Sequence, residues 1–252
     1  MSTGATQRKG IKALPGDLGR IRFTVSGEAA LEGTDTDDPG TMDWRGTASI
    51  SAWPFDDEDD LDAEKLRKTG FALSVEDIGD GGLRMTILQA HGLLIDLWRV
   101  QDVYSALDAR SQDYANFLPM FGDQGDYGEV ELAEGLEESL NPGGSQVVIL
   151  DRVRLAPAWR GCGGVGRLLT IRLLHWLCDD PRVVALKPFP IDLDEEQQKD
   201  KATFDKAMNM VRQTWKSIGF EPFTDDIWVL DPRTGNFERT TKKLSIQLGL
   251  RH

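Results

Sequence analysis

A stretch rich in glycine and arginine in the second half of the chain has the residue types of an anion-binding loop. Its sequence, RGCGGVGR at residues 160–167, follows a strand-like run and begins an apolar segment typical of a buried helix. Glycines leave successive backbone N–H groups uncovered, and a helix N-terminus adds partial positive charge. The two arginines supply full charges. We therefore expect this loop to bind phosphate oxygens.

Three kinds of phosphate-binding loop were weighed against this stretch. A Walker A loop ends in Gly-Lys-Ser/Thr, whereas Gly166 is followed by Arg-Leu, so a site for a Mg-nucleotide is not expected. The G-x-G-x-x-G spacing of residues 161–166 satisfies the dinucleotide fingerprint. That fingerprint follows a short apolar strand directly, but here the strand carries three charged residues and PAWR intervenes. The hypothesis of a dinucleotide-binding oxidoreductase is kept as an alternative, because the glycine spacing supports it, but no other feature does.

The third kind of loop fits the flanking residues best. LAPAWRG at residues 155–161 and GVGRLL at 164–169 resemble the central motif of the GNAT superfamily of N-acetyltransferases. TWKSIGFE at 214–221 resembles the aromatic-x-x-x-Gly-Phe signature of that family, and the two motifs have the family's spacing. The resemblance covers about residues 146–230. At residues 162–164 the loop is one residue longer than is usual in the family.

The resemblance implies an α/β (α+β) fold with a mixed, mostly antiparallel sheet flanked by helices. The sheet is expected to be splayed near residues 153–155, so that acetyl-CoA, the co-substrate, can enter. The implied reaction transfers its acetyl group to an amine of a small molecule or peptide. In the family the loop amides bind the pyrophosphate and the preceding strand binds the pantetheine arm. The expected acetyl-CoA contacts are Val153, Arg154, Leu155, Arg160, Gly161, Gly163, Gly164, Val165, Gly166 and Arg167.

The catalytic residues usual in the family are not evident. Many members have a Tyr acid four residues before Gly-Phe, where this chain has Trp215, and a Glu base on the preceding strand, where it has none. Asp151 shares strand parity with apolar neighbours, so burial would raise its pKa and suit a base. The alternative hypothesis for Asp151 is that a neighbouring arginine neutralises its carboxylate and that it has no catalytic role. His91 could face the substrate or be structural. A non-catalytic CoA-binding module is therefore a second hypothesis.

Several other reactive or bulky residues receive structural interpretations. A thiolate role for Cys162 is not expected, because a pyrophosphate would compete for the same positive field. His175 and the tryptophans Trp159, Trp176, Trp215 and Trp228 are assigned to the core. No Cys/His spacing indicates a metal site. The acidic run at residues 56–62 predicts a solvated loop or helix start, with a cation trap as its alternative.

Composition narrows the function classes. The 252 residues carry 29 Lys+Arg against 42 Asp+Glu, a net charge of −13, which argues against nucleic-acid or membrane partners. The N-terminus is polar, no apolar run reaches the roughly 20 residues of a membrane span, and two cysteines fit a cytoplasmic location. The oligomeric state stays open, and a homodimer is one possibility.

We expect a flexible tail over residues 1–18 and one domain over 19–252. Within it, residues 19–128 form the acceptor side and 129–252 bind acetyl-CoA.

The elements that must position the loop follow from hydrophobic periodicity. A strand over 146–155 should lead into the loop, and a buried helix over 164–178 should follow it. A second amphipathic helix, over 201–218, should end at Gly219. Further predicted strands lie around residues 21–25, 47–53, 71–75, 83–97, 182–186, 227–230 and 243–248, and a further helix spans 102–121.

Overall fold

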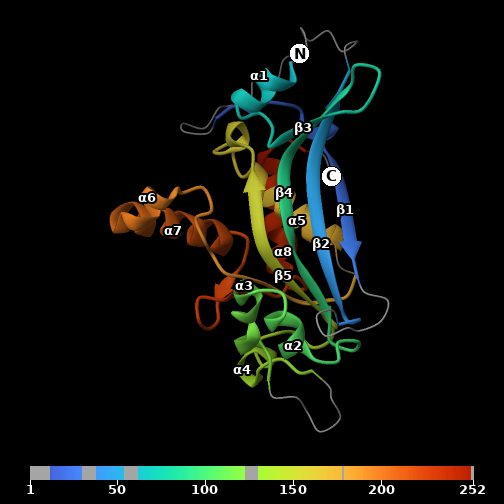
Figure 1. Cartoon of the computed structure of the whole chain (residues 1–252), viewed down its shortest axis with the longest axis vertical. Helices are drawn as coiled ribbons and strands as arrows, with labels where there is room; N and C mark the ends of the chain where they lie inside the picture. The colour runs from blue at the N-terminus through green and yellow to red at the C-terminus, as the bar shows by residue number, and fades with distance from the viewer. Residues whose placement is uncertain (1–11, 30–37, 54–61, 123–129, 178, 251–252) are drawn as a thin grey trace.

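The structure, a computed structural model, describes residues 12–29, 38–53, 62–122, 130–177 and 179–250. Within these residues one sheet of eight strands runs in the order β1-β2-β4-β5-β6-β8-β7, and β3 pairs with β4 beside this path. Neighbouring strands are antiparallel except for β5 and β6, which are parallel. The fold is thus a mixed α+β arrangement on a mostly antiparallel open sheet (Figure 1).

The strands are β1 Arg22–Glu28, β2 Thr41–Ala52, β3 Ser74–Asp77, β4 Leu83–Asp96, β5 Gln146–Leu155, β6 Pro181–Leu186, β7 Glu221–Pro222 and β8 Trp228–Leu230. The α-helices are α1 Ala63–Lys68, α2 Val103–Asp108, α3 Gln112–Ala115, α4 Glu134–Glu137, α5 Val165–Leu177, α6 Glu195–Lys199, α7 Lys201–Lys216 and α8 Gly235–Gln247. Three short 3-10 helices are η1 Leu18–Arg20, η2 Leu118–Met120 and η3 Pro157–Trp159. None of the described helices combines the length and apolar character needed to cross a bilayer.

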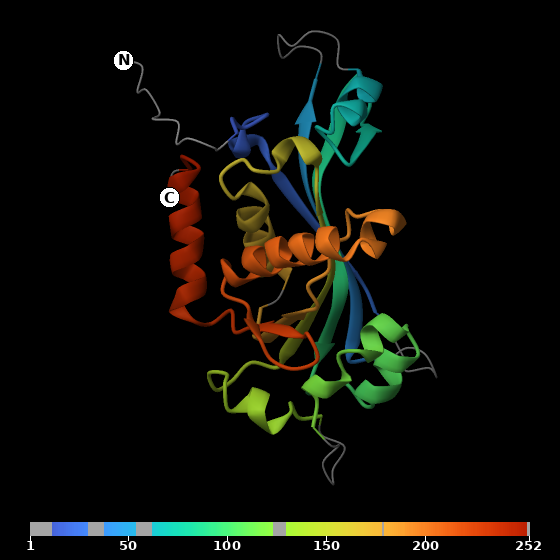
Figure 2. The same ribbon diagram turned by 90° about the vertical axis from the view of Figure 1, so that its left-hand side faces the viewer.

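The sheet separates two hydrophobic cores. Figure 2 shows α5 and α8 on one side of the sheet, and α2 and α3 on the other. Val148 and Leu150 of β5 are buried in the core shared with α5 and α8. Val147 and Ile149 are buried in the core shared with α2 and η2. Because successive strand residues point to opposite faces, one strand contributes to both cores, which explains its nearly continuous apolar sequence.

The parallel strands β5 and β6 pair over only part of their length. Their register ends at Ile149 opposite Ala185, whereas β5 continues to Leu155. β6 ends at Leu186, so beyond Ile149 β5 continues with no partner on this side among the described strands, and α7 lies beside β5 at this opening (Figures 1 and 2). Residues 153–155, where the splay was predicted, belong to this part of β5, which has no partner on the β6 side among the described strands.

Two predicted elements were wrong. Residues 102–121 form α2, α3 and η2 instead of one helix, because Ser111 caps a new helix start and Pro119 begins a 3-10 turn. Residues 243–248 are the end of α8 instead of a strand. The alternation of Leu244, Ile246 and Leu248 suggested a strand, yet Leu244 is buried and Ile246 is 62% exposed. Helical spacing of Leu244 and Leu248 places both against the core.

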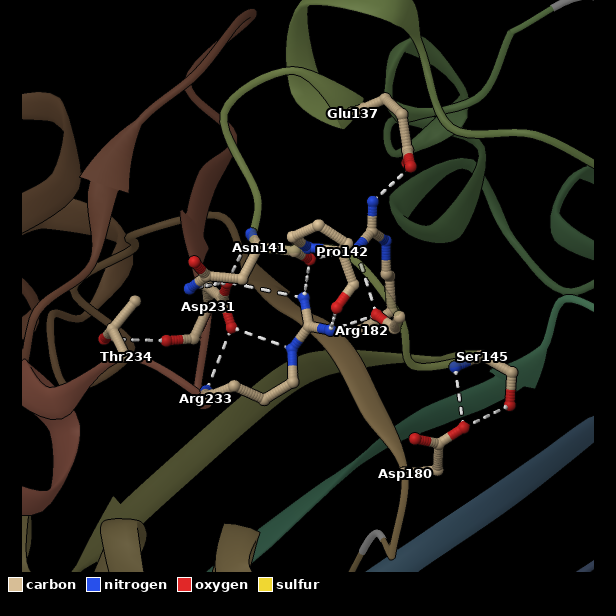
Figure 3. Close-up of polar contacts among 10 residues, drawn as sticks. Glu137, Asn141, Pro142, Ser145, Asp180, Arg182, Asp231, Arg233 and Thr234 are labelled. Atoms are coloured by element: carbon tan, nitrogen blue, oxygen red, sulfur yellow. Dashed lines mark hydrogen bonds and ion pairs between the residues drawn. The ribbon is translucent and has the colours of Figure 1, made fainter.

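A cluster of hydrogen-bonded polar groups links the turn at residues 141–144, which precedes β5, to β6 and to the end of β8. Arg182 on β6 is 4% exposed and donates to the carbonyls of Asn141 and Gly143 and to Glu137 (Figure 3). Arg233, just after β8, donates to the same two carbonyls and to Asp231. The carboxylate of Asp231 also accepts from the backbone and side-chain nitrogens of Asn141, both at 2.9 Å. These bonds satisfy polar groups that burial would otherwise leave unpaired.

Two other predicted regions fall partly outside the described residues. Of the expected tail, residues 12–18 are described and contact the glycine loop: the Lys12 N–H donates to the Gly161 carbonyl at 3.3 Å. Of the acidic run, residues 56–61 lie outside the described ranges. Asp62 caps α1 by accepting hydrogen bonds from the N–H groups of Glu64 and Lys65.

Candidate functional site

The glycine loop lies between β5 and α5 and is fixed at its base by Trp159. This side chain is fully buried, and its Nε1 donates to the Phe71 carbonyl at 2.9 Å. After Trp159, the chain turns through Gly161, Gly163 and Gly164, whose φ angles are 75°, 70° and 97°. Side chains rarely adopt these left-handed conformations, so the tight turn into α5 requires glycine.

The loop presents a run of uncovered N–H groups. The first N–H of the α5 region to find a backbone acceptor is that of Leu168, which donates to Gly164 at 3.0 Å. The N–H groups of residues 161–167 have no hydrogen-bond acceptor within the described part of the chain. Unsatisfied N–H groups at the start of a long helix attract anions, because the helix dipole adds to their own partial charges.

Two connected cavities lie at this loop. One, of about 620 Å³, covers the loop itself, and the other, of about 690 Å³, lies in the opening between β5 and β6. We call the two together the groove. Of the predicted contact residues, those lining the groove are Val153, Leu155, Arg160, Gly161, Gly164, Val165, Gly166 and Arg167.

The remaining two predicted contacts lie outside the groove. Arg154 is exposed on β5, opposite Gln89 of β4. Gly163 lies in the turn, and its carbonyl accepts from Gln247 Nε2 at 2.9 Å. Gly163 has a positive φ, so its role is to let the backbone turn into α5.

Cationic side chains flank the groove. Arg160 is held by the Leu155 carbonyl and by Asp192, each at 3.0 Å. Arg167 donates to Ser217 Oγ at 2.9 Å, at the end of α7. Sequence reasoning missed Lys12, whose side chain passes beside Gly161. No local pattern could have found it, because it is far from the loop in the sequence.

The groove wall opposite the loop was also missed. It is formed by α7 and the segment before α6, through Phe189, Pro190, Ile191, Leu193, Ala207, Met210, Val211, Thr214, Trp215 and Ile218. The sequence predicted an amphipathic helix here and assigned Trp215 to the core. The clue to the groove was Met210, an apolar residue of α7 that is 56% exposed and lines the groove.

A β-bulge in β5 brings His91 and Asp151 together. His91 pairs with Arg152, but the next residue, Gly92, pairs with Leu150, so Asp151 is the extra residue. Asp151 Oδ2 lies 3.2 Å from His91 Nδ1. Among the ion pairs of the described residues, none joins Asp151 to a neighbouring arginine, so its partner is the histidine.

The bulge also corrects the predicted strand parity. Val147 and Ile149 face the core of α2, but Val153 and Leu155 pack against the core of α5. A single extra residue moves all later side chains to the other face. Asp151 stands where the two alternations meet, and it lines the groove.

The surroundings of the pair shift two pKa values. Burial lowers the pKa of His91 below its ordinary 6.5; Asp151 opposes this shift, and Arg152 and Arg45 reinforce it. Burial, aided by the charge of Asp151, raises the pKa of Tyr114 on α3 well above its ordinary value. At neutral pH the imidazole is therefore neutral and the phenol keeps its proton.

The surroundings of the other candidate residues do not favour a reactive role. Cys162 is 2% exposed, and burial raises the pKa of its thiol. His175 is exposed and Trp176 is 72% exposed, so their assignment to the core was wrong. Both face solvent near the end of α5, on the side opposite its buried stripe. Across the described ranges, no three His, Cys, Asp or Glu side chains gather as a metal site.

The chain was compared with models of protein families, with curated proteins and with solved structures. None of the three comparisons found a match.

Proposed function

We propose that the protein is an N-acetyltransferase that moves the acetyl group of acetyl-CoA to an amine of a small molecule or peptide. The observation that carries the proposal is the continuity of the groove. The N–H groups of Gly161 and of residues 164–167 have no acceptor within the described part of the chain, and these residues line the groove that continues along the edge of β5 beyond the end of β6. CoA has the same sequence of parts, because its pyrophosphate is joined to a long pantetheine arm that carries the thiol.

The parts of the groove match the parts of this ligand in chemistry. The loop amides with Arg160 and Arg167 suit the pyrophosphate. Beyond Ile149 the edge of β5 has no strand partner on the β6 side within the described residues, so its amides suit the amides of pantetheine. The apolar wall of α7 would exclude water from the thioester.

A non-catalytic CoA-binding module is the second candidate, and the position of Trp215 favours it. Trp215 packs edge-to-face against Phe220, with ring centroids 5.4 Å apart, and lines the groove. It has no acidic proton for a departing thiolate. A dinucleotide-binding oxidoreductase is disfavoured, because the sheet has one parallel strand pair where a doubly wound fold has several.

Two measurements separate these candidates. Thermal shifts with acetyl-CoA, NADH and NADPH should show stabilisation by acetyl-CoA alone; stabilisation by the nicotinamide dinucleotides instead would favour the oxidoreductase. Steady-state thiol release from acetyl-CoA with a panel of primary amines should then show turnover. Binding without turnover would identify a CoA-binding module. The proposal retains the cytoplasmic location and expects no nucleic-acid or membrane partner.

A further inference from the structure

We propose that Nε2 of His91 is the general base that takes the proton of the acceptor amine, and that Asp151 is its positioning residue. This inference rests on the proposed acetyl transfer. It locates the acceptor site on the face of the sheet that carries α3, next to the opening between β5 and β6.

The geometry of the pair assigns the two roles. Nδ1 of His91 lies 3.2 Å from Asp151 Oδ2. The negative charge of the carboxylate beside Nδ1 favours the neutral tautomer that carries its hydrogen on Nδ1. In that tautomer Nε2 carries a lone pair. The His91 side chain is 43% exposed and Asp151 is 25% exposed. The imidazole can therefore reach an incoming molecule, while the carboxylate stays behind it.

The His91–Asp151 pair lies between the groove proposed for the pantetheine arm and the proposed acceptor side near α3. Asp151 lines the groove proposed for the pantetheine arm, and it is also close enough to raise the pKa of Tyr114 on α3. His91 does not itself line the groove; it lies next to Asp151, which does, on the face of the sheet covered by α3. An acceptor that approaches from α3 would meet the base and the thioester together.

The charged groups around His91 are compatible with a base at neutral pH. Arg152 on β5 and Arg45 on β2 disfavour a protonated imidazole, and Asp151 favours it. Tyr114 on α3 faces the same carboxylate and keeps its proton. With burial included, the pKa of His91 lies below 6.5, so the neutral base predominates at pH 7.

The step balances without a further reagent. His91 Nε2 takes one proton from the ammonium form of the acceptor, and the free amine attacks the thioester carbon. The protonated His91 then releases this proton to solvent and is a base again. A C–N bond forms and the C–S bond breaks, so the electron pair leaves on the CoA sulfur. The thiolate gains its proton from solvent, and the amide nitrogen loses its remaining extra proton to water.

The test compares His91→Gln and Asp151→Asn with the wild type by acetyl-CoA turnover. The acceptor is the amine used fastest by the wild type among spermidine, phenethylamine and a lysine-containing peptide. His91→Gln should lower kcat/KM about 100-fold at pH 7, and the deficit should shrink as the pH approaches the pKa of the amine. Asp151→Asn should move the acidic limb of the profile to lower pH, because Asp151 raises the pKa of His91.

His175→Gln is the matched control, since His175 is exposed on α5 away from the groove, and it should retain wild-type turnover. His91→Asn and calorimetry with CoA on every variant separate a lost base from a lost fold. Variants of His91 that bind CoA and match the control at every pH would overturn the base but leave the transferase standing. A wild type that binds CoA without turnover, or that does not bind CoA, would overturn the proposed function and the base with it.

Discussion

The thiol of Cys162 lies inside the glycine loop but is turned away from the groove. Its Sγ is within hydrogen-bonding distance of the carbonyls of Ala13, at 3.4 Å, and Ala158, at 3.5 Å. Burial raises the pKa of the thiol, although nearby Lys12 opposes the shift. The side chain therefore packs the N-terminal segment against the loop and has little thiolate at neutral pH.

Replacement of Cys162 should separate packing from chemistry. In Cys162→Ala the loss of one small buried side chain should lower stability by about 1 kcal/mol. The rate of acetyl transfer should stay within about twofold of the wild type, because no covalent acetyl-enzyme passes through this sulfur. Urea unfolding and steady-state kinetics would measure the two effects. Loss of transfer with intact CoA binding would instead indicate a nucleophilic thiolate.

At the scale of single residues, the glycine loop was predictable from the sequence, and the His91–Asp151 contact was only partly so. Gly161, Gly163 and Gly164 carry a local backbone requirement, which the structure shows as positive φ angles. His91 and Asp151 were each considered alone. Their contact depends on one extra residue in β5, and the sequence carries no periodic signal for a bulge within an apolar strand.

At the scale of elements, the bulge depends on Gly92. A Cβ at this position would lie 1.9 Å from the carbonyl oxygen of Ile149, which is backbone and cannot rotate away. The glycine therefore lets β4 approach β5 closely where the register shifts.

The substitution Gly92→Ala should force the strands apart at the bulge. We expect a loss of about 1–3 kcal/mol in the free energy of unfolding, the usual cost of overpacking. It should also change the NMR titration of His91, because the contact with Asp151 moves. Gly135→Ala on α4 is the control, since nothing lies within 4 Å of its added Cβ. Equal stability of the two variants would contradict the close contact between Gly92 and the Ile149 carbonyl.

The polar cluster around Asp231 gives the link between β8 and the 141–144 turn a pH dependence. Burial of this carboxyl raises its pKa, but hydrogen bonds from Asn141 and Arg233 outweigh burial and hold the pKa below 3.8. A depressed carboxyl pKa adds stability that is present above the unfolded value and is lost as the pH falls through the folded value.

Asp231→Asn should therefore be less stable than the wild type at pH 7, and the difference should disappear on acidification below about pH 3.8. Chemical unfolding at a series of pH values measures this. Asp205→Asn, on the exposed surface of α7, should show no such difference. A gap between wild type and Asp231→Asn that persists unchanged in strong acid would contradict the electrostatic origin.

Elements were predictable where periodicity and burial agreed. The strand at 146–155 was predicted to the residue, because residues 147–150 are buried on both faces and residues 152–155 alternate between exposed arginines and half-buried apolar side chains. The end of α8 was wrong because KLSIQL alternates over six residues, and a short alternating run fits a strand or an exposed helix equally well. The break between α2 and α3 depends on caps that apolar spacing does not reveal.

At the scale of the whole molecule, the chain combines a net charge of −13 with a local cationic site. Arg160 and Arg167 stand at the two ends of the glycine loop, and Lys12, which is distant in sequence, passes beside Gly161. In an acidic protein a polyanion binds only where such charges are concentrated. The central claim is that this site holds the diphosphate of CoA.

Calorimetric titration with CoA tests that claim most directly. The wild type should bind one CoA per chain, and Arg167→Glu should weaken binding at least tenfold, because a charge-assisted bond of about 1.5–3 kcal/mol is lost. Arg154→Glu makes the same charge change on β5, outside the groove, and should bind like the wild type. Absence of heat from the wild type, or equal weakening by both substitutions, would contradict the account.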